Sequence, residues 1–125
     1  MTTNSESFDR GMEMRRSVLG DEHVDRVTKA ATDVDRDFQT WLTEKVWGDL
    51  WTRPGLSPRD RSLVTIAILG ALGHDEAKLH LKAARNTGVT PAEITEALLH
   101  VAVYAGVPAA NRAFHVMKTI YEEEE

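Results

Sequence analysis

The chain has 125 residues, of which 42% are hydrophobic and 28% charged, and its formal net charge at pH 7 is −5. This length suits one domain with an apolar core, and the acidic balance argues against a nucleic-acid or membrane-surface partner. The absence of cysteine excludes disulfides, thiolate metal sites and thiol nucleophiles. We expect a soluble cytoplasmic protein, because no apolar stretch could span a bilayer and the N-terminal residues lack a signal-peptide core.

A glycine separates the first two predicted helices. Residues 1–7 are expected to form a flexible tail, followed by a helix over residues 8–19. Gly20 ends that helix, and Asp21 can cap the next one, which runs to about Ala31. No alternating strand pattern appears in this segment.

The third predicted helix follows Asp33 or Asp35, either of which can cap it. Its apolar residues recur at helical spacing and are Phe38, Trp41, Leu42 and Val46. The helical pattern decays near Gly48. Because residues 47–56 contain two tryptophans, an arginine and a Pro-Gly turn signal, we expect an ordered loop there.

The next two helices have clear start or stop signals. Ser57 can cap a helix over residues 58–72, with proline at its first position. This helix is apolar nearly all round, so we expect it to be buried between other helices or subunits. Asp75 is expected to open the following helix, which Gly88 ends.

Two more helices complete the expected fold. Residues 90–93 repeat the cap, proline and acid pattern, before an apolar stripe formed by Ile94, Ala97, Leu98, Val101 and Ala105. Gly106 and Pro108 break that helix, and a last one is expected over residues 109–121, before the acidic end at 122–125. The pattern predicts an all-α fold of about six or seven helices.

We expect a single domain over residues 8–121. So short a chain has more apolar helix faces than it can cover, which suggests that some of them are buried between subunits.

Four segments, in this order and spacing, carry a resemblance to a known family. They are residues 8–12 with 15–20, residues 47–56, residues 79–86 with 88–90, and residues 98–111. From Phe8 to about Phe114 the chain is similar to the carboxymuconolactone decarboxylase family. The resemblance implies an all-helical fold and a homo-oligomer, a trimer or a hexamer. It also implies cofactor-free decarboxylation of 4-carboxymuconolactone to 3-oxoadipate enol-lactone in protocatechuate breakdown, through the β-ketoadipate pathway.

The same superfamily includes AhpD-like alkylhydroperoxidases, which carry a Cys-x-x-Cys pair before a functional histidine. If His80 is that histidine, the two cysteine positions fall on Gly73 and Glu76. The chain therefore lacks the dithiol that peroxidase chemistry needs. This departure favours the decarboxylase branch.

The implied reaction places three demands on the site. The lactone accepts the electrons released with CO₂, so no organic cofactor or metal is required. The protein must supply cations for the carboxylates, donors for the developing dienolate oxygen, and an acid that protonates carbon. The substrate would be a small dicarboxylate lactone.

Arginines are the natural carboxylate clamps, because the guanidinium fork makes two parallel hydrogen bonds. Arg53 in the tryptophan-rich loop and Arg61 at the start of an interior helix are the first choices, with Arg85 as a further substrate-binding candidate. Each of them could instead make an ordinary ion pair, with Asp49, Asp60 or a neighbouring subunit.

His80 is the leading candidate for proton transfer. It lies on an apolar helical stripe with Ala77, Leu81 and Ala84. Glu76, one turn earlier, could orient the ring or fix its tautomer. The alternative is a core histidine with satisfied hydrogen bonds, but its match to the superfamily's functional histidine favours a catalytic role.

The remaining candidates are less specific. His100 is the second catalytic candidate, and Tyr104 could donate to the enolate oxygen, although both could equally be packing residues. Trp47 and Trp51 could wall off a pocket or only anchor their loop. The five histidines are scattered without paired spacing, so no metal site is expected.

Two other functions remain open from the sequence. One is a lyase, hydrolase or isomerase acting on a related lactone or oxo-acid with the same fold. The other is a non-catalytic oligomeric protein, for which we would expect no convergent cations.

Overall fold

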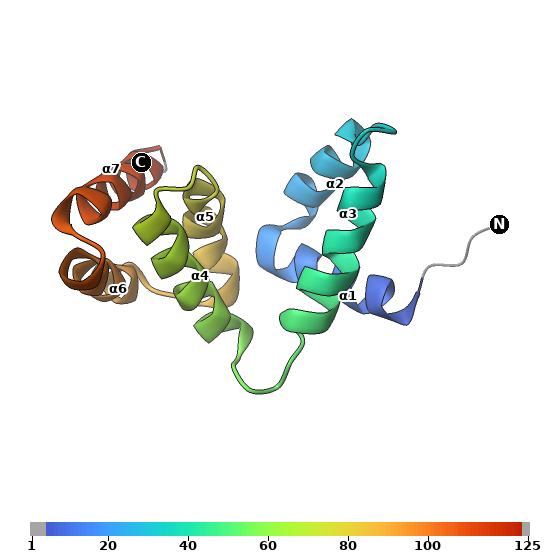
Figure 1. The fold of residues 1–125 in the computed structure, drawn as a ribbon, viewed down its shortest axis with the longest axis horizontal. Helices are drawn as coiled ribbons and strands as arrows, with labels where there is room; N and C mark the ends of the chain where they lie inside the picture. The colour runs from blue at the N-terminus through green and yellow to red at the C-terminus, as the bar shows by residue number, and fades with distance from the viewer. Residues whose placement is uncertain (1–4, 124–125) are drawn as a thin grey trace. The chain divides into compact units, whose positions relative to one another are not determined.

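The computed structural model describes residues 5–123 of an all-α protein (Figure 1). The chain divides into two compact units, Met1–Pro58 and Arg59–Glu125, called here the first and the second unit. Seven α-helices and one π-helix make up the described residues, as the expected count of about six or seven indicated. No helix in that range is long and apolar enough to cross a membrane. The single domain expected over residues 8–121 stays a prediction.

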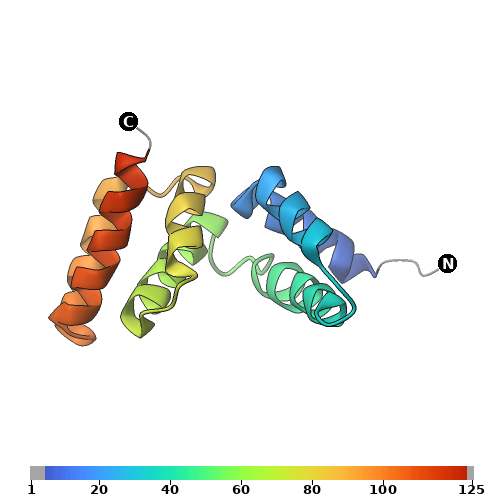
Figure 2. The same cartoon turned by 90° about the horizontal axis from the view of Figure 1, so that it is seen from above.

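The first unit contains three α-helices and the π-helix. These are α1 (Glu6–Leu19), α2 (Asp21–Ala30), α3 (Arg36–Leu42) and η1 (Thr43–Leu50), and α1 packs along η1 (Figure 2). The helix predicted from residue 8 starts earlier, because the Ser5 hydroxyl accepts a hydrogen bond from the Phe8 amide and caps it. The expected tail therefore excludes residues 5–7, and residues 1–4 lie outside the described part of the chain.

Three expectations for the first unit were wrong in detail. Asp21 does not cap α2, because Gly20, with φ of 91°, takes the N-cap position and Asp21 is the first helical residue. Asp35 is the N-cap residue of α3, but its carboxylate accepts from the Thr32 amide instead of capping the helix. Residues 47–50 are not a loop, because the i→i+5 hydrogen bonding of η1 carries the helix through them.

Two glycines set the packing of α1 on η1. A Cβ atom on Gly11 would lie 1.9 Å from the Thr43 carbonyl oxygen, and one on Gly48 would lie 2.2 Å from the Ser7 carbonyl oxygen. The two backbones thus approach closer than any side chain allows. This contact leaves the expected apolar stripe of α3 outside, with Phe38 59% exposed and Trp41 54% exposed.

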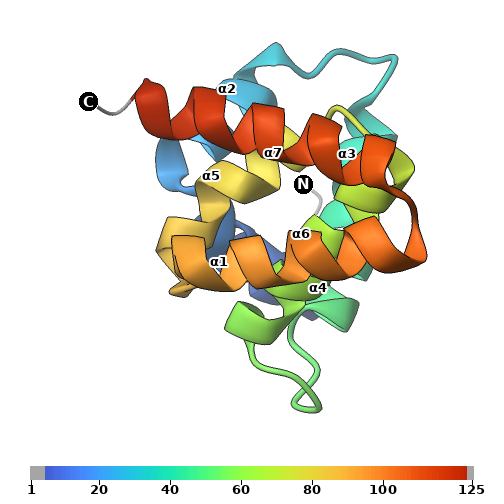
Figure 3. The ribbon, with the colours of Figure 1, turned by 90° about the vertical axis from the view of Figure 1, so that its left-hand side faces the viewer.

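The second unit contains four α-helices. They are α4 (Pro58–Leu72), whose first residue belongs to the first unit, α5 (Ala77–Thr87), α6 (Pro91–Tyr104) and α7 (Val107–Glu122). Figure 3 shows α6 and α7 side by side. Gly88 ends α5 in the left-handed conformation, and Thr90 with Glu93 forms the expected capping box of α6.

Two helix starts in this unit differ from expectation. Asp75 does not open α5, because Glu76 is its N-cap residue. The Asp75 carbonyl accepts a turn hydrogen bond from the Lys78 amide, and the His74 carbonyl accepts one from the Ala77 amide. Pro108 does not interrupt the chain before the last helix. It lies in the first turn of α7, where proline costs no hydrogen bond, and Gly106 is the N-cap residue.

The second unit has the larger apolar core. Its largest fully buried side chains lie on α4, α6 and α7, and they include Ile66, Ile94, Leu98 and Ile120. A hydrogen bond of 2.8 Å from the Thr87 hydroxyl to the Ser62 hydroxyl ties α5 to α4. These contacts fix the backbone of α5, which carries the leading candidate histidine.

The helix α4, expected to be buried on all sides, is buried within the chain on one face only. Ser62, Ile66 and Gly70 face the core. The opposite face is apolar and exposed, with Val64, Ile68 and Leu72 at 47%, 53% and 67% exposure. The sequence expectation for this helix is therefore met only if something outside the second unit covers that face.

Candidate functional site

His80 lies on the buried face of α5, as its spacing predicted. Only 7% of its surface is exposed, and Ala77, Leu81 and Ala84 on the same stripe are also buried. The His80 amide donates to the Glu76 carbonyl oxygen at 3.2 Å, so the two residues are one helical turn apart. Glu76 is exposed, and its proposed orientation of the imidazole stays a prediction.

Arg61 lies on the first turn of α4, next to the buried Ser62, and is half-buried. Its neighbour Arg59 is engaged locally, because it pairs with Asp60 at 2.9 Å and also with Glu93 at the start of α6. The role of Arg61 in binding a carboxylate stays a prediction.

Arg85 lies on the last turn of α5 and is exposed. Its guanidinium lies over the ring of Tyr121, 6.0 Å from the ring centroid. This is a cation–π contact between α5 and α7. It gives Arg85 a packing role beside its candidate role in substrate binding.

The structure brings His100 and Tyr104 together on α6. Their ring centroids are 4.8 Å apart at an interplanar angle of 31°, and both rings line a cavity of about 330 Å³ between α4 and α6. The other walls are apolar residues, including Leu63, Ala67 and Val101, and no lysine or arginine of the described residues lines the cavity. Such a cavity suits an apolar contact better than a dicarboxylate.

Trp47 and Trp51 form a second pair, in the first unit. Their ring centroids are 4.8 Å apart, and both side chains are at least 95% buried. Arg53 follows them in the exposed loop after η1. These three residues belong to the first unit and the other six candidates to the second, so a site that uses both groups stays a prediction.

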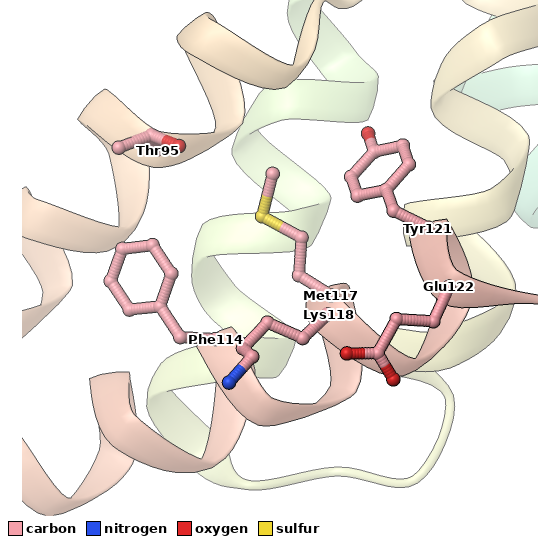
Figure 4. A pocket seen from close by; sticks show the side chains of 6 residues that line it. All are labelled: Thr95, Phe114, Met117, Lys118, Tyr121 and Glu122. Atoms are coloured by element: carbon pink, nitrogen blue, oxygen red, sulfur yellow. The ribbon is translucent and has the colours of Figure 1, made fainter. Parts of the chain in front are cut away.

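A cavity of about 340 Å³ between α6 and α7 was not anticipated from the sequence (Figure 4). Phe114 and Met117 give it an apolar wall, and Lys118 and Glu122 stand at its rim with opposite charges. The charges of this rim cancel, so the cavity does not select a dianion. Its apolar wall lies on α7.

Sequence reasoning also missed Arg15, the most buried charged side chain of the described residues, with 6% exposure. Its guanidinium donates to the Thr43 hydroxyl and to the Gln39 side-chain oxygen, each at 3.1 Å. Burial lowers the pKa of Arg15 from its ordinary value. The signal was present in the spacing, since Gly11, Arg15 and Val18 share one helix face.

The described residues contain no group of three or more histidine, aspartate or glutamate side chains placed to hold a metal ion.

Comparisons with known proteins give a consistent result. A sequence model of the carboxymuconolactone decarboxylase family matches residues 36–119. A protein named 4-carboxymuconolactone decarboxylase, from Acinetobacter baylyi, is 43% identical over 121 residues, which cover 96% of this chain and 90% of that protein. A nitrosuccinic acid decarboxylase, npaB of Metarhizium robertsii, is 45% identical over 115 residues, covering 90% of this chain and 80% of its own length.

Proposed function

Because this chain belongs to the carboxymuconolactone decarboxylase family, we propose that it is a cytoplasmic carboxy-lyase that converts 4-carboxymuconolactone to 3-oxoadipate enol-lactone. The reaction needs no cofactor and serves protocatechuate breakdown through the β-ketoadipate pathway. The observation that carries the proposal is the 43% identity to a protein of that name over 96% of the chain.

The chemistry assigns the protein a limited task. The carbon–carbon bond to the carboxylate breaks, and its electron pair moves through the C=C bond into the lactone carbonyl oxygen. A proton then returns to carbon and gives the enol-lactone. Because the lactone accepts the electrons, the side chains only bind the carboxylates, stabilise the dienolate oxygen and deliver the proton.

We assign proton delivery to His80 and carboxylate binding to Arg61. His80 is supported by its burial on a rigid helix, since a fixed and desolvated imidazole keeps its reacting geometry. Arg61 is supported by its place beside the buried face of α4. Glu76, His100, Arg53, Arg85, Tyr104 and the tryptophan pair keep the supporting roles expected from the sequence.

The test is a coupled assay in which a cycloisomerase forms 4-carboxymuconolactone from carboxymuconate, with enol-lactone and CO₂ measured. We expect both products to appear in equal amounts and only with this protein present. His80→Gln should lower kcat by about 10²–10⁴-fold, the usual contribution of a positioned acid. His115→Gln, at an exposed position of α7, is the matched control. Hydrolysis without CO₂ release would favour the lactone-hydrolase alternative, and no turnover would favour a non-catalytic protein.

A second candidate substrate is nitrosuccinate, which the 45% identity to a nitrosuccinic acid decarboxylase favours. In both compounds one carbon carries a carboxylate, a carboxymethyl group and an electron acceptor, the unsaturated lactone or the nitro group. Loss of the same carboxylate would then give a nitronate in place of a dienolate. The ratio of kcat/KM for the two compounds decides which of them this chain prefers.

We also propose that the chain works as a homo-oligomer, a trimer or a hexamer, in which a second copy covers the exposed face of α4. The support is the exposed apolar surface, which includes Val64, Ile68 and Leu72 on α4 and Leu99 and Val103 on α6. Sedimentation velocity on the wild type should show the oligomer. Ile68→Glu should shift it toward the monomer, whereas Ala92→Glu, at an exposed position of α6, should not.

A further inference from the structure

The first unit contains a buried cation that the proposed reaction does not use. Only 6% of the surface of Arg15 is exposed. Its two hydrogen-bond acceptors, Thr43 and Gln39, are both neutral. The Nε atom is buried and has no acceptor among the described residues. A guanidinium has five N–H donors, so Arg15 retains bonding capacity that this chain does not satisfy.

No carboxylate of the described residues compensates this charge. Within residues 5–123, the ion pairs of the arginines on α1 involve Arg10 and Arg16, and none involves Arg15. Burial is also the one cause that shifts its pKa. A buried charge is normally paired, because its desolvation is costly. An anion from outside the chain would supply the missing partner.

A cavity of about 220 Å³ adjoins Arg15, between α1, the end of α2 and α3. Among residues 5–123, its walls include a second cation, Arg36, and no aspartate or glutamate. Arg36 pairs with Asp33, but its side chain is 59% exposed. Of the two arginines in these walls, Arg36 has an acidic partner and Arg15 has none among the described residues, so Arg15 favours an anion.

The apolar part of this cavity comes from Phe8 and Met12 on α1. One ring with a carboxylate fits the volume, whereas most drug-sized ligands need at least about 300 Å³. A phenyl side chain and a thioether both make favourable contacts with a flat, unsaturated body. The walls thus suit a ligand that has a carboxylate at one end and a small apolar ring at the other.

We propose that the cavity beside Arg15 is a binding site for a small unsaturated or aromatic monocarboxylate, whose carboxylate pairs with the Arg15 guanidinium. The site lies wholly within the first unit. The proposal requires neither the decarboxylation nor any residue assigned to it.

The experiment is calorimetric titration of the full chain with benzoate and, separately, with benzamide, which has the same shape without the charge. Benzoate should bind at least ~10-fold more tightly than benzamide, because a charge-assisted pair replaces a neutral contact. Arg15→Met should remove this difference, and Arg36→Gln should reduce it. The matched control is Arg26→Gln, an exposed arginine of α2 outside the cavity, which should bind as the wild type does.

A second variant keeps the test decisive if Arg15→Met does not fold. Gln39→Glu has nearly the same shape and places an internal carboxylate 3.1 Å from the Arg15 guanidinium. It should raise the melting temperature and lower benzoate affinity by about 10-fold, because the cation is then already paired. Equal binding of benzoate and benzamide by the wild type would overturn the proposal. So would undiminished benzoate affinity in Gln39→Glu, which would place the ligand elsewhere.

Discussion

The helices of the first unit pack against one another in a different way from the helices of the second unit. In the first unit, α1 and η1 meet backbone to backbone through Gly11 and Gly48, and the buried Arg15 links them by hydrogen bonds. In the second unit, a core of branched aliphatic side chains joins α4, α6 and α7. The difference teaches that one helical chain can be stabilised by close packing of backbones in one unit and by burial of apolar side chains in the other.

This difference decides which substitutions each unit tolerates. Packing between backbones leaves no room to adjust, so adding one carbon atom is costly. An aliphatic core instead loses stability in proportion to the volume that is removed from it. Additions should therefore damage the first unit most, and deletions the second.

The largest effect is expected for Gly11→Ala. The new Cβ would lie 1.9 Å from the Thr43 carbonyl oxygen, a backbone atom that moves only with η1. We expect a loss of at least ~3 kcal/mol in the free energy of unfolding, the upper range for overpacking. Urea denaturation followed by tryptophan emission measures it, because all three tryptophans lie in the first unit.

Gly55→Ala is the matched control, since a Cβ atom there has no neighbour within 4 Å. Its stability should stay within about 0.5 kcal/mol of the wild type. If Gly11→Ala were as stable as this control, backbone packing would not be what orders the first unit.

A somewhat smaller loss is expected for Leu98→Ala. Leu98 is fully buried in the core of the second unit, and its truncation should cost about 3 kcal/mol. Leu99→Ala, one residue along the same helix and 50% exposed, should cost far less. Thermal unfolding by far-ultraviolet circular dichroism measures both. Similar costs for the two variants would contradict an aliphatic core as the source of order.

The smallest effect is expected for Thr90→Ala, which removes the hydroxyl of the capping box at the start of α6. The loss should be about 1 kcal/mol, because one helix-end amide loses its acceptor. Thr90→Ser keeps the acceptor and should retain most of the stability in the same denaturation experiment. Equal losses in the two variants would show that the methyl group, and not the hydroxyl, stabilises this corner.

The sequence predicted the second unit better than the first. Thr90, Gly88 and the stripe through Leu98 are local signals for helix start, helix end and buried face, and the structure confirms them. The first unit depends on signals that are not local. The contact between Gly11 and Gly48 joins segments far apart in the chain, and helical periodicity encodes neither this contact nor the wide turns of η1.

The same reason explains why the aromatic residues of α3 are exposed. Phe38 and Trp41 follow helical spacing, but the face that packs on α1 is the one with Thr43 and Gly48, which are small enough for a close approach. For the candidate site, spacing placed His80 correctly on a buried stripe. Which arginine meets it depends on three-dimensional placement, so that part stays a prediction.

The π-helix has a consequence for the length of the chain. Its amide bonds reach one residue further back than those of an α-helix, as in the 3.0 Å bond from the Trp51 amide to the Val46 carbonyl oxygen. Deleting one residue from 43–50 would let ordinary α-helical pairing take over and remove the wide turn that carries Gly48 against α1. Natural variants should therefore gain or lose residues around Gly55, where the backbone is exposed, and keep a constant number between Thr43 and Trp51.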